Sequence, residues 1–184
     1  QALWQAVMGD NPSRFNDDPE KPVDWVSWDD VQAFLQRVQA MLAGVAVQLP
    51  SEAEWEYACR AGSEGAYTWG ETITPEQANY GSSGTVPVRS YPPNAWGLYE
   101  MHGNVWEWCA DGMRKYDDAA QENPRGPEDQ GAPRVARGGS WINVAWGLRS
   151  AYRIGGLRDD RLGNLGFRFS LRSTSQVAGA ERRR

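Results

Sequence analysis

The chain is poor in the residues that metal, disulfide and thiol sites use. Its 184 residues include one histidine and two cysteines. A single histidine cannot build a three-histidine or facial-triad metal site. Cys59 and Cys109 are too few for a disulfide framework and lack C-x-x-C spacing. We therefore expect His102 to be a structural or exposed imidazole and each cysteine to be a buried free thiol.

Other absences narrow the class of function. No apolar run approaches the roughly 20 residues that a membrane span needs, so no span is expected. The formal net charge of -5 disfavours nucleic acid or an anionic membrane as the main partner. The sequence also has no nucleophile elbow, P-loop or dinucleotide-binding glycine motif. Its carboxylates form no evident acid–base pair, so these enzyme classes are disfavoured.

The residues that are abundant predict a loop-rich fold with a few helices. Ten tryptophans and 20 glycines favour long, well-packed loops. Residues 2–8 resemble a short helix ended by Gly9. A longer helix follows Ser27, which forms a capping box with Asp30. Its buried face is predicted from the i, i+3, i+4, i+7 spacing of Trp28, Val31, Leu35, Val38 and Leu42.

A third predicted helix follows the short strand expected over residues 45–50. Ser51 and Glu54 form its capping box, and Gly62 is expected just beyond its end. After Gly62 the helix signals stop, and only short strand-like phrases and loops follow. Helices ahead of a strand-poor, loop-rich half indicate an α+β domain.

Several phrases, taken together and in order, resemble one family. "LPSEAEWEYACRAG", "YTWGE", "ANYG", "YPPNAWGLYEMHGNVWEWCAD", "RVARGGSW" and "LGFRF" are similar to the formylglycine-generating-enzyme (sulfatase-modifying factor) domain. The match runs from about Trp4 to Phe169. The resemblance implies a C-type-lectin-like fold, here a single domain over residues 1–172 with a flexible tail over 173–184.

Family members usually begin with a strand ahead of the position of Gln1. We therefore expect an N-terminal strand to be missing from this sequence. A signal peptide ahead of Gln1 is compatible with the sequence, which leaves a secreted or cell-surface location open.

The resemblance does not extend to the family's chemistry. Its oxidase activity uses two cysteines shortly after the "GGS-aromatic" phrase, and these bind copper and do thiol chemistry. By position they would fall near Asn143 and Leu148, but no cysteine follows Ser140. Related iron enzymes use a histidine cluster, which this chain lacks. We therefore expect no copper, no iron and no enzymatic activity.

Residues 138–165 combine a regular frame with unpatterned insertions. Candidate frame residues are Trp141, Trp146, Arg149, Tyr152, Arg153 and Phe167. The insertion positions are Ile142, Asn143, Val144, Gly147, Ile154, Gly155, Gly156, Leu157, Arg158, Asp160, Leu162, Gly163 and Asn164.

This arrangement resembles the variable proteins of diversity-generating retroelements, which use the same lectin-like fold. In those proteins adenine-directed mutagenesis rewrites a C-terminal stretch, mostly at asparagine codons. Changing only the adenines of AAC yields Ile, Val, Gly, Leu, Asp or Arg, and every insertion position holds Asn or one of these. Glu, Lys, Gln, Met and Trp cannot arise in this way, and the insertion positions contain none of them.

We therefore expect a non-catalytic, monomeric protein whose stretch over about 138–166 is diversified to bind protein or cell-surface ligands. Apolar contacts would come from Ile142, Val144, Ile154, Leu157 and Leu162, and polar contacts from Asn143, Arg158, Asp160 and Asn164. Random side chains are tolerated only where they point into solvent, because core volume changes cost about 1 to 5 kcal/mol.

Three alternatives remain open. Ile142, Ile154, Leu157, Leu162 and Leu165 could be ordinary core residues. The protein could instead be a cysteine-less pseudoenzyme or a partner subunit of a sulfatase-modifying system. It could also be an enzyme of unfamiliar chemistry on this fold.

The phrase "GLYEMHGNVWEW" places Glu100 and Glu107 around a glycine-containing turn. Carboxylates and carbonyls in a tight loop suit Ca²⁺. The resemblance implies a structural calcium held by the side chains of Glu100 and Glu107 and the carbonyls of Gly103 and Val105. Solvated glutamates that stabilise a turn are the alternative. A second family site would use Asn79 and Tyr80, but its acidic loop is shortened here to "GSSG", so we expect it less.

Overall fold

The computed structural model describes residues 1–117, 119–127, 129 and 131–173. It confirms an α+β fold with little regular structure. In chain order the elements are α1 (Ala2–Met8), α2 (Trp28–Met41), β1 (Val45–Gln48), α3 (Glu52–Arg60), β2 (Trp106–Gly112), β3 (Arg134–Arg137), the 3-10 helix η1 (Ala145–Leu148), β4 (Arg153–Gly156), β5 (Leu165–Phe167) and β6 (Ser170–Ser173).

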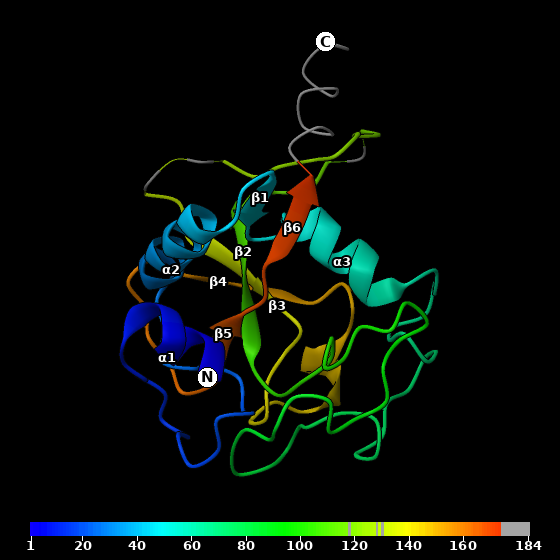
Figure 1. Cartoon of the computed structure of the whole chain (residues 1–184). Coiled ribbons are helices and arrows are strands. Elements are labelled where there is room, and N and C mark those ends of the chain that lie inside the picture. The colour runs from blue at the N-terminus through cyan, green and yellow to red at the C-terminus, as the bar shows by residue number, and fades with distance from the viewer. Residues whose placement is uncertain (118, 128, 130, 174–184) are drawn as a thin grey trace.

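The described strands form two sheets. One has the order β4-β3-β2-β5, with β2 and β5 parallel and the other neighbours antiparallel. The other pairs β1 with β6. Ser173 pairs with Val45 in that ladder, so the expected tail does not begin at residue 173, and 174–184 lie outside the described residues. Figure 1 shows α1 and α2 on one side of the larger sheet, α3 on the other, and loops filling the lower half of the molecule.

The two predicted capping boxes are present. Ser27 accepts from the backbone N–H of Asp30, and Ser51 accepts from that of Glu54. The buried face of α2 comprises Val31, Phe34, Leu35 and Val38. The prediction for Leu42 is wrong: α2 ends at Met41, and Leu42 is extended and exposed.

The larger sheet separates two parts of the core because side chains alternate along a strand. Trp106 and Trp108 of β2 pack with Trp4, Phe34 and Leu165 on the side of α1 and α2. Cys109 of the same strand packs on the other side. There it forms a cluster with Trp55 and Cys59 of α3, Met101 of a loop and Val135 of β3. Fully burying one such aromatic side chain stabilises the fold by about 1.5–3 kcal/mol. Because β2 contributes side chains to both clusters, it is the central strand of the core.

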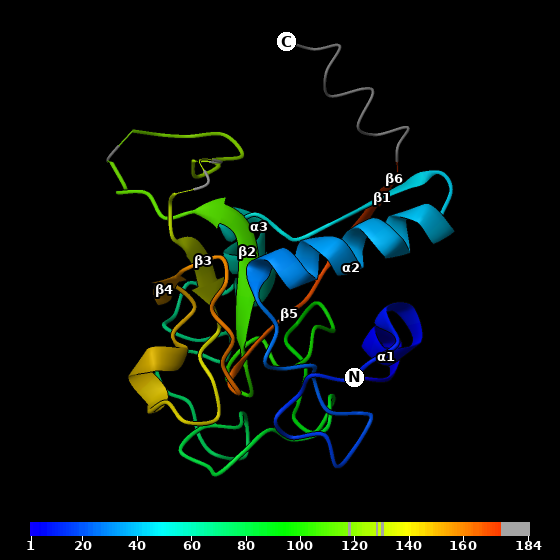
Figure 2. The same cartoon turned by 90° about the vertical axis from the view of Figure 1, so that its left-hand side faces the viewer.

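The stretch of interest leaves the sheet after β3, rejoins it at β4 beside β3, and rejoins it again at β5 beside β2. Gly138 (φ 94°) and Gly139 (φ 75°) turn the chain out of β3 in left-handed conformations. A Cβ at Gly139 would lie 2.8 Å from the carbonyl oxygen of Gly147, so only glycine fits there. Beyond this turn, η1 and β4 lie at the same side of the molecule, joined to β5 by a loop (Figure 2).

Candidate functional site

Four apolar insertions face solvent. Ile142, Val144, Leu157 and Leu162 are 59%, 56%, 59% and 47% exposed. They come from three separate segments of the stretch: the loop before η1, the turn after β4 and the approach to β5. We call them the four exposed insertions. Their exposure rules out the core alternative for Ile142, Leu157 and Leu162.

Of two other apolar residues of the stretch, Leu165 is buried in the core and Ile154 is half-buried against it. Leu165 is 3% exposed and pairs with Trp106 in the parallel ladder. Ile154 pairs with Ala136 in β3 and packs against the core on the α2 side. The core alternative is therefore correct for Leu165. The expectation that Ile154 projects into solvent like the other insertions is wrong, because the ladder turns it inward.

Several frame residues hold the stretch as expected. Trp141 is buried, and its indole N–H donates to the carbonyl of Gly163 over 3.1 Å, which ties the start of the stretch to its end. Its ring packs edge-on against Phe15, with centroids 5.4 Å apart. Tyr152 stacks in a tilted arrangement on Trp106 at 5.9 Å. These contacts fix the backbone from which the insertions project.

The remaining frame candidates divide between packed and exposed positions. Arg153 forms an ion pair with Glu52 at 2.8 Å, and the ring of Phe167 packs edge-on against Phe34 at 5.3 Å. Trp146 is 55% exposed, with its ring edge-to-face on Tyr152 at 5.0 Å. Arg149 is also exposed, and its Nε donates to the carbonyl of Trp146. Trp146 is thus not a buried frame residue but extends the exposed apolar surface.

Polar insertions in the first and last loops are bound within the stretch. Asn143 Oδ1 accepts from the Ser140 backbone N–H at 2.9 Å and from its hydroxyl at 2.7 Å. The Asn164 amide donates to the same Ser140 hydroxyl. Asp160 Oδ2 accepts from the Leu157 N–H at 2.7 Å, closing the turn after β4. These side chains shape the loops before any ligand is present.

Arg158 is bound to α2. Its guanidinium donates to Asp29 Oδ1 at 3.0 Å through Nε, and it lies 4.7 Å from the ring centroid of Trp28. The backbone N–H of Asp29 in turn donates to the Arg158 carbonyl. A ligand that binds the Arg158 guanidinium would therefore have to compete with Asp29, which already accepts from it.

The glycine insertions are the least free. Gly147 and Gly163 are buried. A Cβ built at Gly156 would lie 2.7 Å from Cη2 of Trp108, a fully buried ring. At Gly155 it would lie 2.8 Å from Cγ of Met113, and at Gly163 it would lie 2.6 Å from Cδ of Arg14, both in flexible side chains. The expectation that every insertion points into solvent is wrong for Gly147, Gly156 and Gly163: Gly147 is buried, with Asn143 beside it, and Trp108 and Arg14 lie against Gly156 and Gly163.

The thiols and the histidine are buried in the core. Cys59 and Cys109 are buried and free. Burial raises the pKa of Cys59 to about 12 and the pKa of Cys109 well above its ordinary value. His102 is 1% exposed, its Nε2 accepts from the Thr68 N–H at 3.1 Å, and its Nδ1 lies 2.7 Å from the Leu148 carbonyl. Burial lowers the pKa of His102 to about 4, so the ring is neutral at pH 7. A protonated thiol of this kind is a poor nucleophile and a poor copper ligand.

The residues of the predicted calcium site line one cavity. Glu100, Gly103, Val105 and Glu107 all contribute to a cavity of about 590 Å³. Burial raises the pKa of Glu100, although the N–H groups of Arg89 and Tyr91 donate to its carboxylate. Carboxylates and backbone carbonyls are the donor types that a hard cation takes.

A cation already adjoins this cavity. Arg168 binds both oxygens of Glu107 at 2.5 and 2.7 Å, and the indole of Trp55 donates to Glu107 at 2.6 Å. A carboxylate offers about four acceptor positions, so Glu107 keeps limited capacity for a metal. The alternative of solvated glutamates is wrong for Glu107, which is 6% exposed.

The second predicted metal position is occupied by the protein's own groups. Asn79 donates to the Gly84 carbonyl and to Asn104 Oδ1, and its Oδ1 accepts from Ser82. The hydroxyl of Tyr80 donates to the Ile73 carbonyl. Within the described ranges no group of three or more His, Cys, Asp or Glu side chains could hold a metal. Here Asn79 organises the shortened loop.

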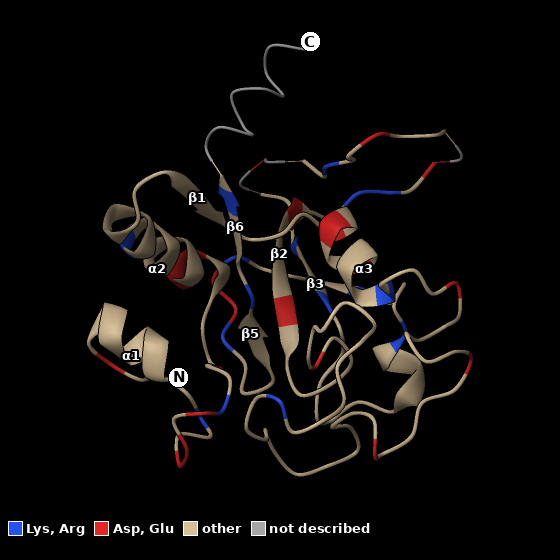
Figure 3. Ribbon diagram, turned by 45° about the vertical axis from the view of Figure 1, so that its right-hand side comes forward, with Lys and Arg blue, Asp and Glu red and all other residues tan. Residues whose placement is uncertain are grey.

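Figure 3 shows acidic and basic residues interspersed over helices and loops. Across the part of the chain that the structure describes, no helix is long and apolar enough to cross a membrane.

Sequence reasoning missed Trp25, which is 43% exposed. Its backbone N–H donates to the Leu162 carbonyl at 3.0 Å. Its place in "VDWVSW" offered no local signal of exposure.

Comparisons with known proteins agree with this geometry. The model of the sulfatase-modifying factor enzyme 1-like domain matches residues 1–172. The formylglycine-generating enzyme of Streptomyces coelicolor is 40% identical over 172 residues, covering 82% of this chain and 52% of the relative. The inactive C-alpha-formylglycine-generating enzyme 2 of Bos taurus is 35% identical over 188 residues, covering 91% and 56%. The chain thus spans about half the length of these relatives.

A solved structure is similar over nearly the whole domain. Treponema denticola variable protein 1 superposes with a TM-score of 0.82 at 31% identity, covering 92% of this chain and 80% of that one. The sequence similarity therefore leads both to proteins named as enzymes and to a protein named as variable.

Proposed function

The chain belongs to the sulfatase-modifying factor enzyme 1-like family, and we propose that it is a non-catalytic, ligand-binding member of it. The four exposed insertions carry this proposal, since they are 47–59% exposed on a backbone fixed by Trp141 and Tyr152. A contiguous patch of exposed apolar side chains often marks a binding site, whereas exposed apolar residues that are scattered singly do not. The ligand class that fits is a partly apolar protein surface.

The thiol chemistry argues against catalysis. The chain has two cysteines. Both are buried, and burial raises the pKa of each. Neither lies in the stretch after Ser140, where the family's reactive pair would be expected. A site without a reactive thiolate cannot perform thiol-dependent oxidation.

We also propose that the stretch is diversified. Every insertion position holds Asn or a residue reachable from it by adenine changes. The similarity to Treponema denticola variable protein 1 supports the same reading. The structure narrows where diversity is useful: substitutions at the four exposed insertions change surface chemistry, whereas those at Gly156 meet Trp108.

A structural calcium completes the proposal. Glu100 and Glu107, with the carbonyls of Gly103 and Val105, would hold it, and the ion would favour the ionised form of the half-buried Glu100 carboxylate. Arg168 would then share Glu107 with the metal.

The test of diversification is to sequence the DNA encoding residues 138–169 from many individuals of the source population. We expect differences confined to the insertion positions, with Trp141, Arg149, Tyr152 and Phe167 constant. An invariant stretch would contradict the proposal.

One other function has a specific observation in its favour. The Bos taurus relative is named an inactive enzyme, so a cysteine-less pseudoenzyme or a partner subunit of a sulfatase-modifying system is the second candidate. An invariant stretch, together with binding of this chain to a formylglycine-generating enzyme in a pull-down, would establish it.

A further inference from the structure

One exposed tryptophan interrupts a buried segment just ahead of α2. Asp24, Val26 and Ser27 are fully buried, whereas Trp25 is 43% exposed. The described structure gives its indole N–H no hydrogen-bond partner and its ring no stacking partner. The ring therefore presents a large apolar surface to solvent, and its indole N–H remains available as a donor at the edge of that surface.

The backbone of Trp25 is also strained. Its φ is 63°, in the left-handed region that glycine and asparagine adopt readily and bulky residues rarely do. The flanking contacts enforce this conformation: Asp24 Oδ1 accepts from the Arg14 N–H at 2.8 Å, and the Trp25 N–H donates to the Leu162 carbonyl at 3.0 Å. Strain of this kind concentrates at binding and catalytic sites, where the surrounding structure holds it.

The hydrogen bond places Trp25 directly beside one of the four exposed insertions. Leu162 is 47% exposed, and its carbonyl accepts from Trp25. Adenine changes in an asparagine codon cannot produce tryptophan, and position 25 lies far ahead of residues 138–166. The backbone of Trp25 is therefore bonded to that of an exposed insertion, and position 25 lies outside the stretch proposed to vary.

We propose that Trp25 is a constant anchor of the ligand-binding surface, used by whichever insertions surround it; the inference rests on the proposed function. Tryptophan is enriched among residues that dominate binding energy, because its rigid ring supplies a large contact area at low entropic cost. The ligand that fits is a protein surface with an apolar patch and an acceptor, such as a carbonyl oxygen, at its edge for the indole N–H.

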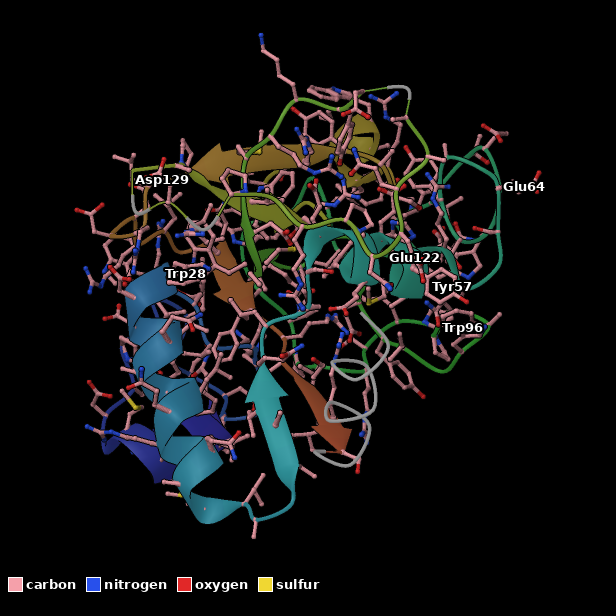
Figure 4. The ribbon with its side chains drawn as sticks, turned by 90° about the horizontal axis from the view of Figure 1, so that it is seen from above. Trp28, Tyr57, Glu64, Trp96, Glu122 and Asp129 are labelled. Atoms are coloured by element: carbon pink, nitrogen blue, oxygen red, sulfur yellow. The ribbon has the colours of Figure 1, made fainter. Side chains whose placement is uncertain are left out.

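Libraries displayed on yeast can test this role. Positions 142, 144, 157 and 162 are randomised in three backgrounds: the parent chain, Trp25→Asn and Trp96→Asn. Asparagine tolerates the left-handed backbone at position 25. Trp96 is the matched control because it is 49% exposed and packs edge-on against Tyr57 at 4.9 Å. Figure 4 shows the Tyr57–Trp96 pair on the opposite side of the molecule from Trp28, which contacts the stretch through Arg158.

Each library is selected against lysozyme as the probe, with display level measured through an epitope tag. At equal display we expect roughly tenfold fewer binding clones with Trp25→Asn than with the parent or Trp96→Asn, the loss of one modest binding residue. Trp25→Tyr, which retains an aromatic ring, should recover most of them. The melting temperature of Trp25→Asn should equal or exceed that of the parent, since the strain is relieved.

Two results overturn the assignment while leaving the proposed function intact. One is equal recovery of clones from the parent and Trp25→Asn libraries. The other is a Trp25→Asn melting temperature several degrees below the parent, which would make the ring structural. Failure of all three libraries to yield binders would reject the ligand-binding function itself, and the anchor with it.

Discussion

Gly156 and Leu157 are neighbours in sequence, and the structure predicts opposite responses to the same kind of change. A Cβ at Gly156 would lie 2.7 Å from Cη2 and 3.3 Å from Cζ3 of Trp108. Trp108 has no exposed surface, and its indole N–H is bound to the Val26 carbonyl at 3.1 Å, so the ring cannot move aside. Leu157 is 59% exposed.

The expected magnitudes follow from these environments. Forcing an additional methyl group into a packed core costs about 1–3 kcal/mol. For a chain of 184 residues, each kcal/mol lowers the melting temperature by roughly 2–4 °C. We therefore expect Gly156→Ala to lower it by roughly 2–12 °C. Leu157→Ala should change stability by less than about 0.5 kcal/mol, as surface substitutions do.

Urea unfolding followed by circular dichroism measures both free energies. An unchanged m-value would show that the Gly156→Ala effect is a loss of stability and not a change in the unfolded state. If the two variants are equally stable, the reasoning that the core confines Gly156 is refuted. In that case position 156 would be as free to diversify as position 157.

Three further predictions concern the groups below this surface. Calcium at about 100 times its Kd should stabilise the protein by about 2.7 kcal/mol and should not stabilise Glu100→Gln; equal melting temperatures of the parent chain in calcium and in chelator would leave no metal at Glu100. The pKa of His102 is about 4 in the folded chain and 6.5 ordinarily, so between these pH values the imidazole binds a proton only in the unfolded chain. Stability should fall by roughly 3 kcal/mol as pH drops from 6.5 to 4, and His102→Gln should flatten that fall in acid unfolding curves. Cys59 and Cys109 should react with a thiol reagent at pH 8 only on unfolding; rapid labelling of the native protein would refute their burial.

Much of the fold could be predicted because its signals are local. The capping boxes at Ser27 and Ser51 satisfy backbone donors within one turn, so a short phrase identifies each helix start. The end of α2 at Met41 has no comparable local signal. The helical spacing therefore wrongly places Leu42 on the buried face of the helix. The absence of cysteines after Ser140 is a property of the sequence alone, and it is the observation on which the expectation of a non-catalytic protein rests.

The candidate site was predictable as a stretch but not residue by residue. Ile142, Val144, Leu157 and Leu162 face solvent as the unpatterned apolar residues indicated. Nothing in the local sequence distinguishes them from Ile154, which the ladder with Ala136 turns into the core.

The sequence by itself determined the family, the starts of two helices, the absence of a cysteine after Ser140 and the location of the exposed stretch. Tertiary structure alone decided which insertions are free, because the groups that confine them come from remote segments. Trp108 of β2 confines Gly156, Asp29 of α2 binds Arg158, and Arg168 neutralises Glu107 across 61 residues. It also decided that Trp25 faces outward, since its strained backbone is held by contacts with Leu162 that no local pattern records. Local physics specifies where a helix begins; packing between distant segments specifies which side chains remain to meet a ligand.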